Sequence, residues 1–166
     1  MAVLGIGIDS SRSMPRNWIF NVVTDLLDMA GDNEYIVGAF SSTAYIASGP
    51  ESNPEKILRI IELIPFSPGT PDPYPLVREL VEFAALERLP LRGILLLWSM
   101  PKKPRSPCYY ASSLALSSMV KLAVLTPRPY PPRWAYSYTR ECDNNIVFYY
   151  RKSKEKLREI INFFLE

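Results

Sequence analysis

Short apolar segments alternate with amphipathic segments along the whole chain, and this alternation constrains the fold more than any other feature. The apolar runs cover 3–8, 35–40, 43–48, 93–98, 120–125 and 146–150. Apolar residues at helical spacing fill most of the chain between them, in segments 15–31, 52–63, 76–84, 110–118 and 153–165. Strands that alternate with helices build a mainly parallel sheet covered on both faces. The pattern predicts a three-layer α/β/α, doubly wound, Rossmann-like fold.

The spacing of the runs also predicts details of the sheet. Only a very short turn separates segments 35–40 and 43–48, so these two strands must be antiparallel, and we expect one of them at the sheet edge. Run 93–98 shows no polar alternation, which is typical of a strand buried on both faces. The chain has 166 residues and is 48% hydrophobic, enough for one well-filled core. We therefore expect a single domain, 1–166.

Composition excludes several classes of function. The sequence contains no His, which removes the commonest general base and the favourite ligand of zinc. It has no signal-peptide pattern and no apolar run long enough to span a membrane, so we expect a cytoplasmic protein that does not bind membranes. The absence of Gln and the 16 Pro residues weakly favour a thermophilic source. The net charge of only +2 means that a preference for acidic partners must come from local clustering.

The two cysteines, Cys108 and Cys142, lie far apart in the sequence and match no metal-ligand spacing. Free cysteine behaves as a small buried hydrophobe, so we expect two unpaired thiols. A disulfide between them is the alternative.

Polar residues follow the first strand, where a doubly wound sheet binds its ligands. Asp9, Ser11 and Ser13 form an Asp-x-Ser-x-Ser pattern. This pattern resembles the opening of the metal-ion-dependent adhesion site of von Willebrand factor A domains, and the order of strands and helices resembles that family over nearly the whole chain. Phe40-Ser41 resembles the family's usual Phe-Ser, and the Gly69-Thr70 pair resembles the loop that supplies its threonine ligand.

The resemblance implies a site for Mg²⁺ or Mn²⁺ made of Asp9, Ser11, Ser13, Thr70 and the residue after the fourth strand. Mg²⁺ prefers oxygen ligands in an octahedron, and in the family an acidic side chain of the partner often completes that octahedron. However, the family's fourth strand usually finishes in Thr-Asp-Gly, whereas here Trp98-Ser99-Met100 follows. Ser99 stands where the second carboxylate is expected. We therefore predict a degenerate site with weakened or lost Mg²⁺ binding.

Basic side chains gather in the loops that follow the parallel strands, and we call this set the basic rim. It consists of Arg12, Arg16, Lys102, Lys103, Arg105, Arg128 and Arg133. Trp134 and several tyrosines are interleaved in the same loops. The basic rim and Trp134 are predicted to bind a protein partner with an acidic surface, and a nucleic-acid backbone is the alternative.

The resemblance and the absence of catalytic machinery predict a non-catalytic protein-interaction module. A first alternative is a nucleic-acid-associated subunit of a repair or transcription complex. A second is a phosphotransfer or nuclease enzyme, since Gly5 to Ser11 slightly resembles the phosphate loop of actin-like ATPases and the acidic strand of ribonuclease H-like nucleases. Both enzymes need further carboxylates at neighbouring strand ends, which the sequence does not offer. A simpler interpretation is that Asp9 and Asp72 only cap helices.

Overall fold

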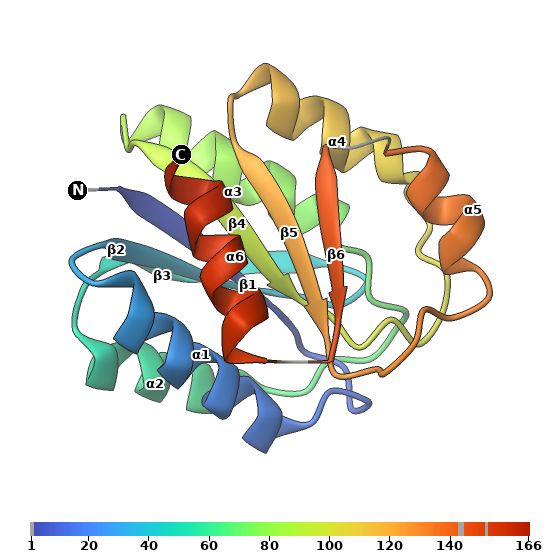
Figure 1. The fold of residues 1–166 in the computed structure, drawn as a ribbon, viewed down its shortest axis with the longest axis horizontal. Helices are drawn as coiled ribbons and strands as arrows, with labels where there is room; N and C mark the ends of the chain where they lie inside the picture. The colour runs from blue at the N-terminus through green and yellow to red at the C-terminus, as the bar shows by residue number, and fades with distance from the viewer. Residues whose placement is uncertain (1, 143–144, 152) are drawn as a thin grey trace.

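The computed structural model describes residues 2–142, 145–151 and 153–166. Strands and helices alternate along this part of the chain (Figure 1). In chain order they are β1 (Val3–Asp9), α1 (Arg16–Ala30), β2 (Glu34–Phe40), β3 (Ala44–Glu51), α2 (Pro54–Glu62), α3 (Tyr74–Leu86), β4 (Leu91–Leu97), α4 (Cys108–Ser117), β5 (Lys121–Thr126), α5 (Ala135–Arg140), β6 (Ile146–Tyr150) and α6 (Lys154–Leu165).

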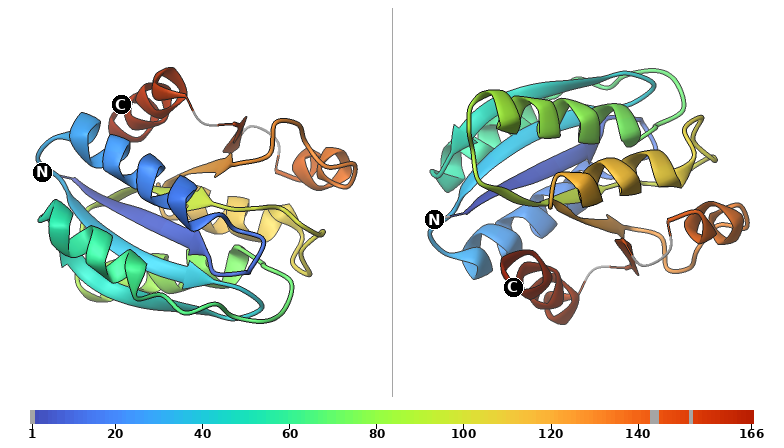
Figure 2. Two further views of the ribbon diagram at one scale, coloured as in Figure 1. Left: turned by 90° about the horizontal axis from the view of Figure 1, so that it is seen from below. Right: turned by 90° about the horizontal axis from the view of Figure 1, so that it is seen from above.

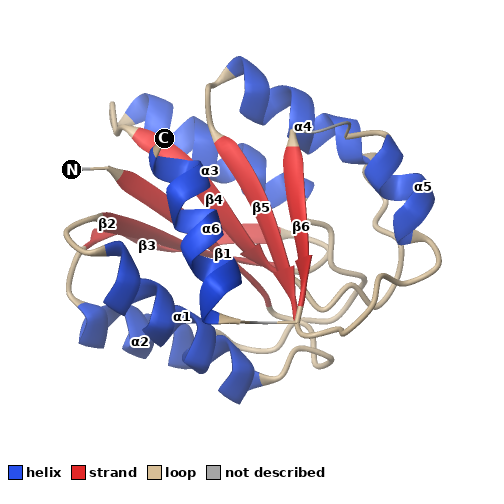
Figure 3. Cartoon of the chain, viewed as in Figure 1, coloured by secondary structure: helices blue, strands red, loops and turns tan. Residues whose placement is uncertain are grey.

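The strands form one sheet in the order β3-β2-β1-β4-β5-β6 (Figure 3). All neighbouring strands are parallel except β2 and β3, which are antiparallel, and β3 lies at the edge. The predicted fold class, with its antiparallel edge strand, is confirmed. Because β1 lies between β2 and β4, the winding reverses next to it, and the carboxyl end of β1 faces the crevice where such sheets bind ligands.

Helices cover both faces of the sheet, as the end-on views in Figure 2 show. Helices α1, α2 and α6 pack against one face, where Leu4, Ile6 and Ile8 of β1 are buried. Helices α3, α4 and α5 pack against the other. The sheet thus divides the apolar interior into two cores, and both are filled by residues that the 3.6-residue and 2-residue periodicities place inward.

Two glycines bring α3 unusually close to the sheet. A Cβ at Gly7 would lie 2.7 Å from Leu76 Cδ2, and one at Gly38 would lie 2.5 Å from Leu76 Cδ1. Neither strand position therefore accepts a side chain unless Leu76 moves. Since Leu76 belongs to the first turn of α3, this contact fixes the start of the helix, and the loop before it, against the carboxyl edge of the sheet.

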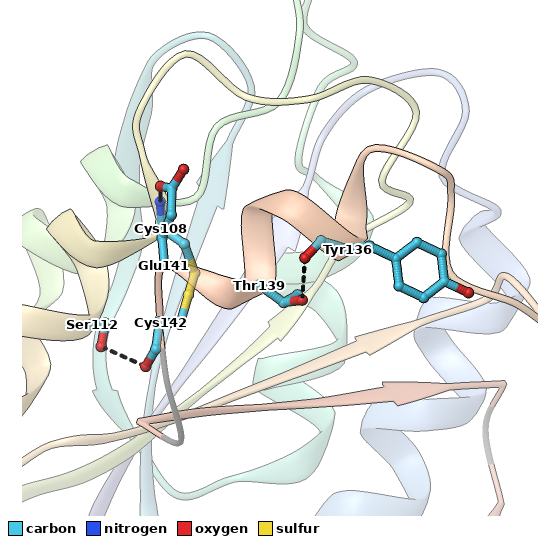
Figure 4. Close-up of a disulfide and its surroundings, with 6 residues drawn as sticks. All are labelled: Cys108, Ser112, Tyr136, Thr139, Glu141 and Cys142. Atoms are coloured by element: carbon cyan, nitrogen blue, oxygen red, sulfur yellow. Dashed lines mark hydrogen bonds between the residues drawn. A yellow bond between two sulfur atoms is a disulfide. The ribbon is translucent and has the colours of Figure 1, made fainter.

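The structure corrects the expectation of two unpaired thiols, because Cys108 and Cys142 form a disulfide with their Cα atoms 5.4 Å apart (Figure 4). It joins the start of α4 to the residues just after α5. Next to it, Cys108 N donates to Glu141 Oε2 at 3.1 Å and Ser112 Oγ donates to the carbonyl oxygen of Cys142 at 3.3 Å. The cysteines are buried, as expected. Because they are 34 residues apart in the sequence, their position along the chain did not indicate that they are in contact.

The helix α5 is a second feature that the periodicity did not predict. It is only six residues long and follows the proline-dense stretch 127–132. Its Ala135 and Tyr138 are buried on the same core as α3 and α4. The other predicted strands and helices are present, with bounds that shift by a few residues; Trp98, for example, lies just beyond β4.

Candidate functional site

Asp9, the last residue of β1, is a buried carboxylate with an exposed fraction of 1%. Its Oδ1 accepts a hydrogen bond from Ser11 N at 2.8 Å. Its Oδ2 accepts from Ser99 N at 2.9 Å and from Ser99 Oγ at 2.5 Å. Hydrogen bonds to a charged acceptor are stronger than neutral ones, so these three donors hold the carboxylate firmly in one orientation.

The hydroxyl groups of three serines continue this network outward. Ser13 Oγ lies 2.8 Å from Ser99 Oγ and 2.9 Å from Ser11 Oγ, and the Ser11 and Ser99 oxygens are 3.5 Å apart. Because the Ser99 hydroxyl donates its only proton to Asp9, Ser13 must donate to Ser99. The structure thus brings Asp9, Ser11, Ser13 and Ser99 together, and we call this group the Asp9 cluster.

Backbone hydrogen bonds fix the loop that carries the first half of the cluster. Ser10 N and Ser10 Oγ both donate to the carbonyl oxygen of Phe40, at 2.9 and 3.1 Å, which ties the end of β1 to the end of β2. Ser67 N donates to the carbonyl oxygen of Ser10 at 3.0 Å. The side chain of Met14 is buried in the apolar core and anchors the loop there. Asp9 and its neighbours are therefore held in place before any ligand binds.

The backbone after β4 places Ser99 next to Asp9. Trp98 N still donates to the carbonyl oxygen of Leu125 at 3.2 Å, so the chain follows β5 for one more residue. Met100 then adopts a left-handed conformation with φ 53° and turns the chain away from the sheet. Arg128 Nε donates to the carbonyl oxygen of Ser99 at 3.1 Å. This bond engages one basic-rim side chain and links the loops after β4 and β5.

Thr70 and Asp72 belong to a second polar group beside the first. Among the described residues, no hydrogen bond joins Thr70 to the Asp9 cluster; Thr70 lines a neighbouring cavity of about 420 Å³. Asp72 is buried, and its carboxylate accepts from Tyr74 N at 3.1 Å, Ser106 N at 3.1 Å and Ser106 Oγ at 2.6 Å. It caps the start of α3 and also fastens the loop after β4. No sequence signal pointed to Ser106.

The oxygen spacing of the Asp9 cluster fits a small divalent cation, but its charge does not. In an octahedron with Mg–O distances of about 2.1 Å, neighbouring ligand oxygens lie about 3 Å apart, close to the Ser11–Ser13 and Ser13–Ser99 separations of 2.9 and 2.8 Å. However, the cluster holds one carboxylate, and both donors of Ser99 already occupy its Oδ2. No group of three or more His, Cys, Asp or Glu residues able to hold a metal occurs in the described ranges. The residues present do not fit a tight Mg²⁺ site.

One member of the basic rim points inward and is structural. The Arg16 guanidinium donates to the carbonyl oxygens of Ile61 at 3.3 Å and Ile64 at 2.5 Å, at the point where α2 ends. It also lies over the Phe66 ring, 4.4 Å from the centroid, while Arg12 lies 5.8 Å from the same centroid. Arg16 therefore holds the end of α2 in place, and Arg12 remains exposed beside it.

The remaining rim cations lie at or near the protein surface. Lys102, Lys103, Arg105 and Arg133 are exposed, and Arg128 is half-buried. In the part of the chain that the structure describes, no basic-rim residue takes part in a salt bridge. Unpaired cations beside a buried, fully hydrogen-bonded carboxylate leave this edge of the sheet with a positive surface.

Trp134 lies in an aromatic cluster. Its ring centroid is 5.6 Å from that of Trp98 and 5.6 Å from that of Tyr138, and the side chain is half-buried. Because Trp134 is half-buried, only part of its surface is exposed.

The phenol of Tyr138 in the same cluster is buried. Burial raises the pKa of the Tyr138 phenol above its ordinary value, and the negative charges of Asp72 and Glu141 act in the same direction.

The fold is shared with solved structures of low sequence identity. An aerotolerance-related membrane protein from Bacteroides fragilis matches with a TM-score of 0.76 and 14% identity, over 99% of this chain and 98% of that one. A von Willebrand factor type A protein from Catenulispora acidiphila matches with a TM-score of 0.70 and 12% identity, over 96% of this chain and 41% of that one. This chain has a von Willebrand factor A-like fold. No family model and no curated protein matches the sequence.

One further match concerns the metal site of this fold. Proximal thread matrix protein 1 from the mussel byssus has been solved with zinc in its metal-ion-dependent adhesion site. It matches with a TM-score of 0.67 and 18% identity, over 97% of this chain and 44% of that one. One protein of the same fold thus binds a divalent metal at a site of the kind that the sequence of this chain resembles. Among the described residues, no helix combines the length and apolar character needed to cross a membrane.

Proposed function

We propose that this von Willebrand factor A-like chain is a non-catalytic interaction module that binds an acidic protein partner at the carboxyl edge of its sheet. Solved structures of this fold include von Willebrand factor A domains, and the resemblance of the sequence to that family implies binding to a partner. The observation that carries the proposal is the composition of that edge. One buried carboxylate is closed off by hydrogen bonds from Ser99, and the loops after β1, β4 and β5 carry cations that form no salt bridge among the described residues.

Weakened metal binding is part of this proposal. At 4 Å and an effective dielectric of about 20, a dication and one carboxylate attract by about 8 kcal/mol before desolvation. Replacing a second carboxylate with Ser99 removes an attraction of that order. The Ser99 hydroxyl must also rotate away from Asp9 before Oδ2 can face a cation, because both of its donors point there. Titration calorimetry with Mg²⁺ and Mn²⁺ is expected to show weak binding. We expect the dissociation constant for Mg²⁺ to exceed the concentration of free magnesium in the cell.

The charge of the partner follows from the rim. Acidic surfaces are steered toward unpaired cations, and this attraction weakens with ionic strength. Fluorescence anisotropy with a labelled hexaglutamate peptide, a hexalysine peptide and duplex DNA tests the preference. We expect hexaglutamate to bind, with affinity that falls as salt is raised, and hexalysine not to bind. Tighter binding of duplex DNA would favour the nucleic-acid alternative, and phosphoester hydrolysis that requires Asp9 would contradict a non-catalytic role.

The cytoplasmic location expected from the sequence stays a prediction, and the Cys108–Cys142 disulfide weighs against it. Disulfides are rare in the cytosol of mesophiles, whereas they are common inside hyperthermophiles. A cytoplasmic location therefore requires a hyperthermophilic source, and the absence of Gln and the 16 Pro residues favour a thermophilic source only weakly.

A further inference from the structure

A cavity of about 420 Å³ lies beside the Asp9 cluster, and its size is within the range of about 300–1,000 Å³ typical of ligand pockets. Three loops build it: the one after β2, the one before α3 and the one after β4. Its lining residues are Ser42, Gly69, Thr70, Asp72, Lys103 and Arg105. We call it the Thr70 cavity.

The lining of the Thr70 cavity has the chemistry of an anion receptor. Lys103 and Arg105 provide two cations, and in the described residues neither forms a salt bridge. Asp72 does not neutralise them by direct pairing, because its oxygens accept from Tyr74 N and from both donors of Ser106. The hydroxyls of Ser42 and Thr70 add two neutral donors.

The Thr70 cavity is also preformed. Gly69 has φ 100°, and a Cβ at this position would lie 2.7 Å from Ser42 Oγ and 2.9 Å from Ser42 Cβ, so only glycine lets the loop close this tightly on Ser42. Ser41 Oγ donates to the carbonyl oxygen of Pro68 at 2.5 Å, and Asp72 N donates to the carbonyl oxygen of Ser41 at 2.9 Å. Because these bonds order the loop in advance, a ligand loses less free energy on binding.

The charge of the Thr70 cavity favours an anion. Two cations and one carboxylate leave a net charge of +1, which matches a singly charged carboxylate. Arg105 can hold a carboxylate through two parallel hydrogen bonds, and Lys103 adds a point charge.

We propose that the Thr70 cavity binds an Asp or Glu side chain of the partner without a metal ion. The proposal rests on the proposed function and names where the acidic residue is bound. In this arrangement Lys103 and Arg105 supply the positive charge that a bound cation supplies in metal-binding members of the fold, such as the zinc-loaded byssus protein.

The test measures hexaglutamate binding by fluorescence anisotropy in EDTA, for the wild type and two double variants. Lys103→Gln/Arg105→Gln removes both cations of the Thr70 cavity and is expected to weaken binding by about tenfold or more. Lys56→Gln/Arg88→Gln removes the same charge from the opposite edge of the sheet and is expected to change affinity by less than about twofold. Thr70→Val, which keeps the side-chain shape, is expected to weaken binding by about threefold or more.

The outcomes separate the two proposals. Equal losses in both double variants would mean that only net charge matters, which overturns the Thr70 cavity as the site but leaves the acidic-partner function intact. Binding that disappears in EDTA would assign the role to a metal and overturn the proposal. If the wild type does not bind hexaglutamate at all, the proposed function itself fails. Thermal unfolding and near-UV circular dichroism confirm that each variant is folded, and competition by phosphate stronger than by glutarate would contradict the preference for carboxylate.

Discussion

Replacing Ser99 with Asp should convert the Asp9 cluster into a metal site. The Ser99 hydroxyl lies 2.5 Å from Asp9 Oδ2, so the variant Ser99→Asp places a second carboxylate against the first. Two like charges at about 4 Å and an effective dielectric of about 20 repel by about 4 kcal/mol. Sharing one proton between the two carboxylates relieves part of this cost. Without metal, the variant should therefore unfold at a lower temperature than the wild type.

A divalent cation should reverse that loss. The cation attracts two carboxylates in place of one, and the hydroxyls of Ser11 and Ser13 already lie 2.9 Å apart, the spacing of neighbouring octahedral ligands. Ligand at 100 times its dissociation constant stabilises the folded state by about 2.7 kcal/mol. For a domain of this size, that corresponds to a rise in Tm of roughly 5–11 °C.

Differential scanning fluorimetry in EDTA and in a series of MgCl₂ and MnCl₂ concentrations measures both effects. The control is Ser99→Asn, which has nearly the same size but no charge and should show little metal response. A folded Ser99→Asp protein whose Tm does not rise with either metal would refute the view that charge, rather than the position of the oxygens, limits metal binding here.

Three further predictions test the packing and the buried groups. Replacing both Cys108 and Cys142 with Ser should lower the free energy of unfolding by about 3–4 kcal/mol, as expected for a closed loop of about 35 residues, and unchanged denaturant curves would contradict this. Gly93→Ala puts a Cβ 2.4 Å from the Phe164 ring, so overpacking should cost about 1–3 kcal/mol in the same assay. Because the pKa of Tyr138 is raised in the folded state, its contribution to stability is complete below about pH 10 and is lost as pH rises, by up to about 1.4 kcal/mol per unit. Tyr138→Phe should remove that alkaline loss, and an unchanged pH profile would argue against a buried phenol.

The fold could be predicted from the sequence because its strands and longer helices carry their own periodicity. The hairpin geometry of β2 and β3 follows from a turn too short for a crossover. Helix α5 could not be predicted in this way. Its sequence, Ala-Tyr-Ser-Tyr-Thr-Arg, has no apolar stripe, and tertiary contacts of Ala135 and Tyr138 hold it in place. The disulfide was missed for a related reason, since pairing depends on how α4 and α5 meet in space.

The candidate site was only partly predictable. The sequence indicated that Asp9, Ser11, Ser13 and Ser99 follow neighbouring strands, which was enough to expect them close together. It did not indicate that the Ser99 hydroxyl donates to Asp9. The sequence also did not indicate that Arg16 points inward. Its position in a loop does not reveal that its guanidinium donates to carbonyl oxygens at the end of α2.

The two glycines beneath α3 have a consequence for how recognition could change in evolution. Gly7 and Gly38 never touch the solvent edge, yet they make room for the Leu76 side chain, which lies in the first turn of α3 just after the loop with Gly69 and Thr70. A methyl group added at either glycine would force the Leu76 side chain to shift, and any part of that shift that reaches the backbone of α3 would move the loop before it. Selectivity could thus be retuned from inside the molecule while every residue facing the partner stays the same.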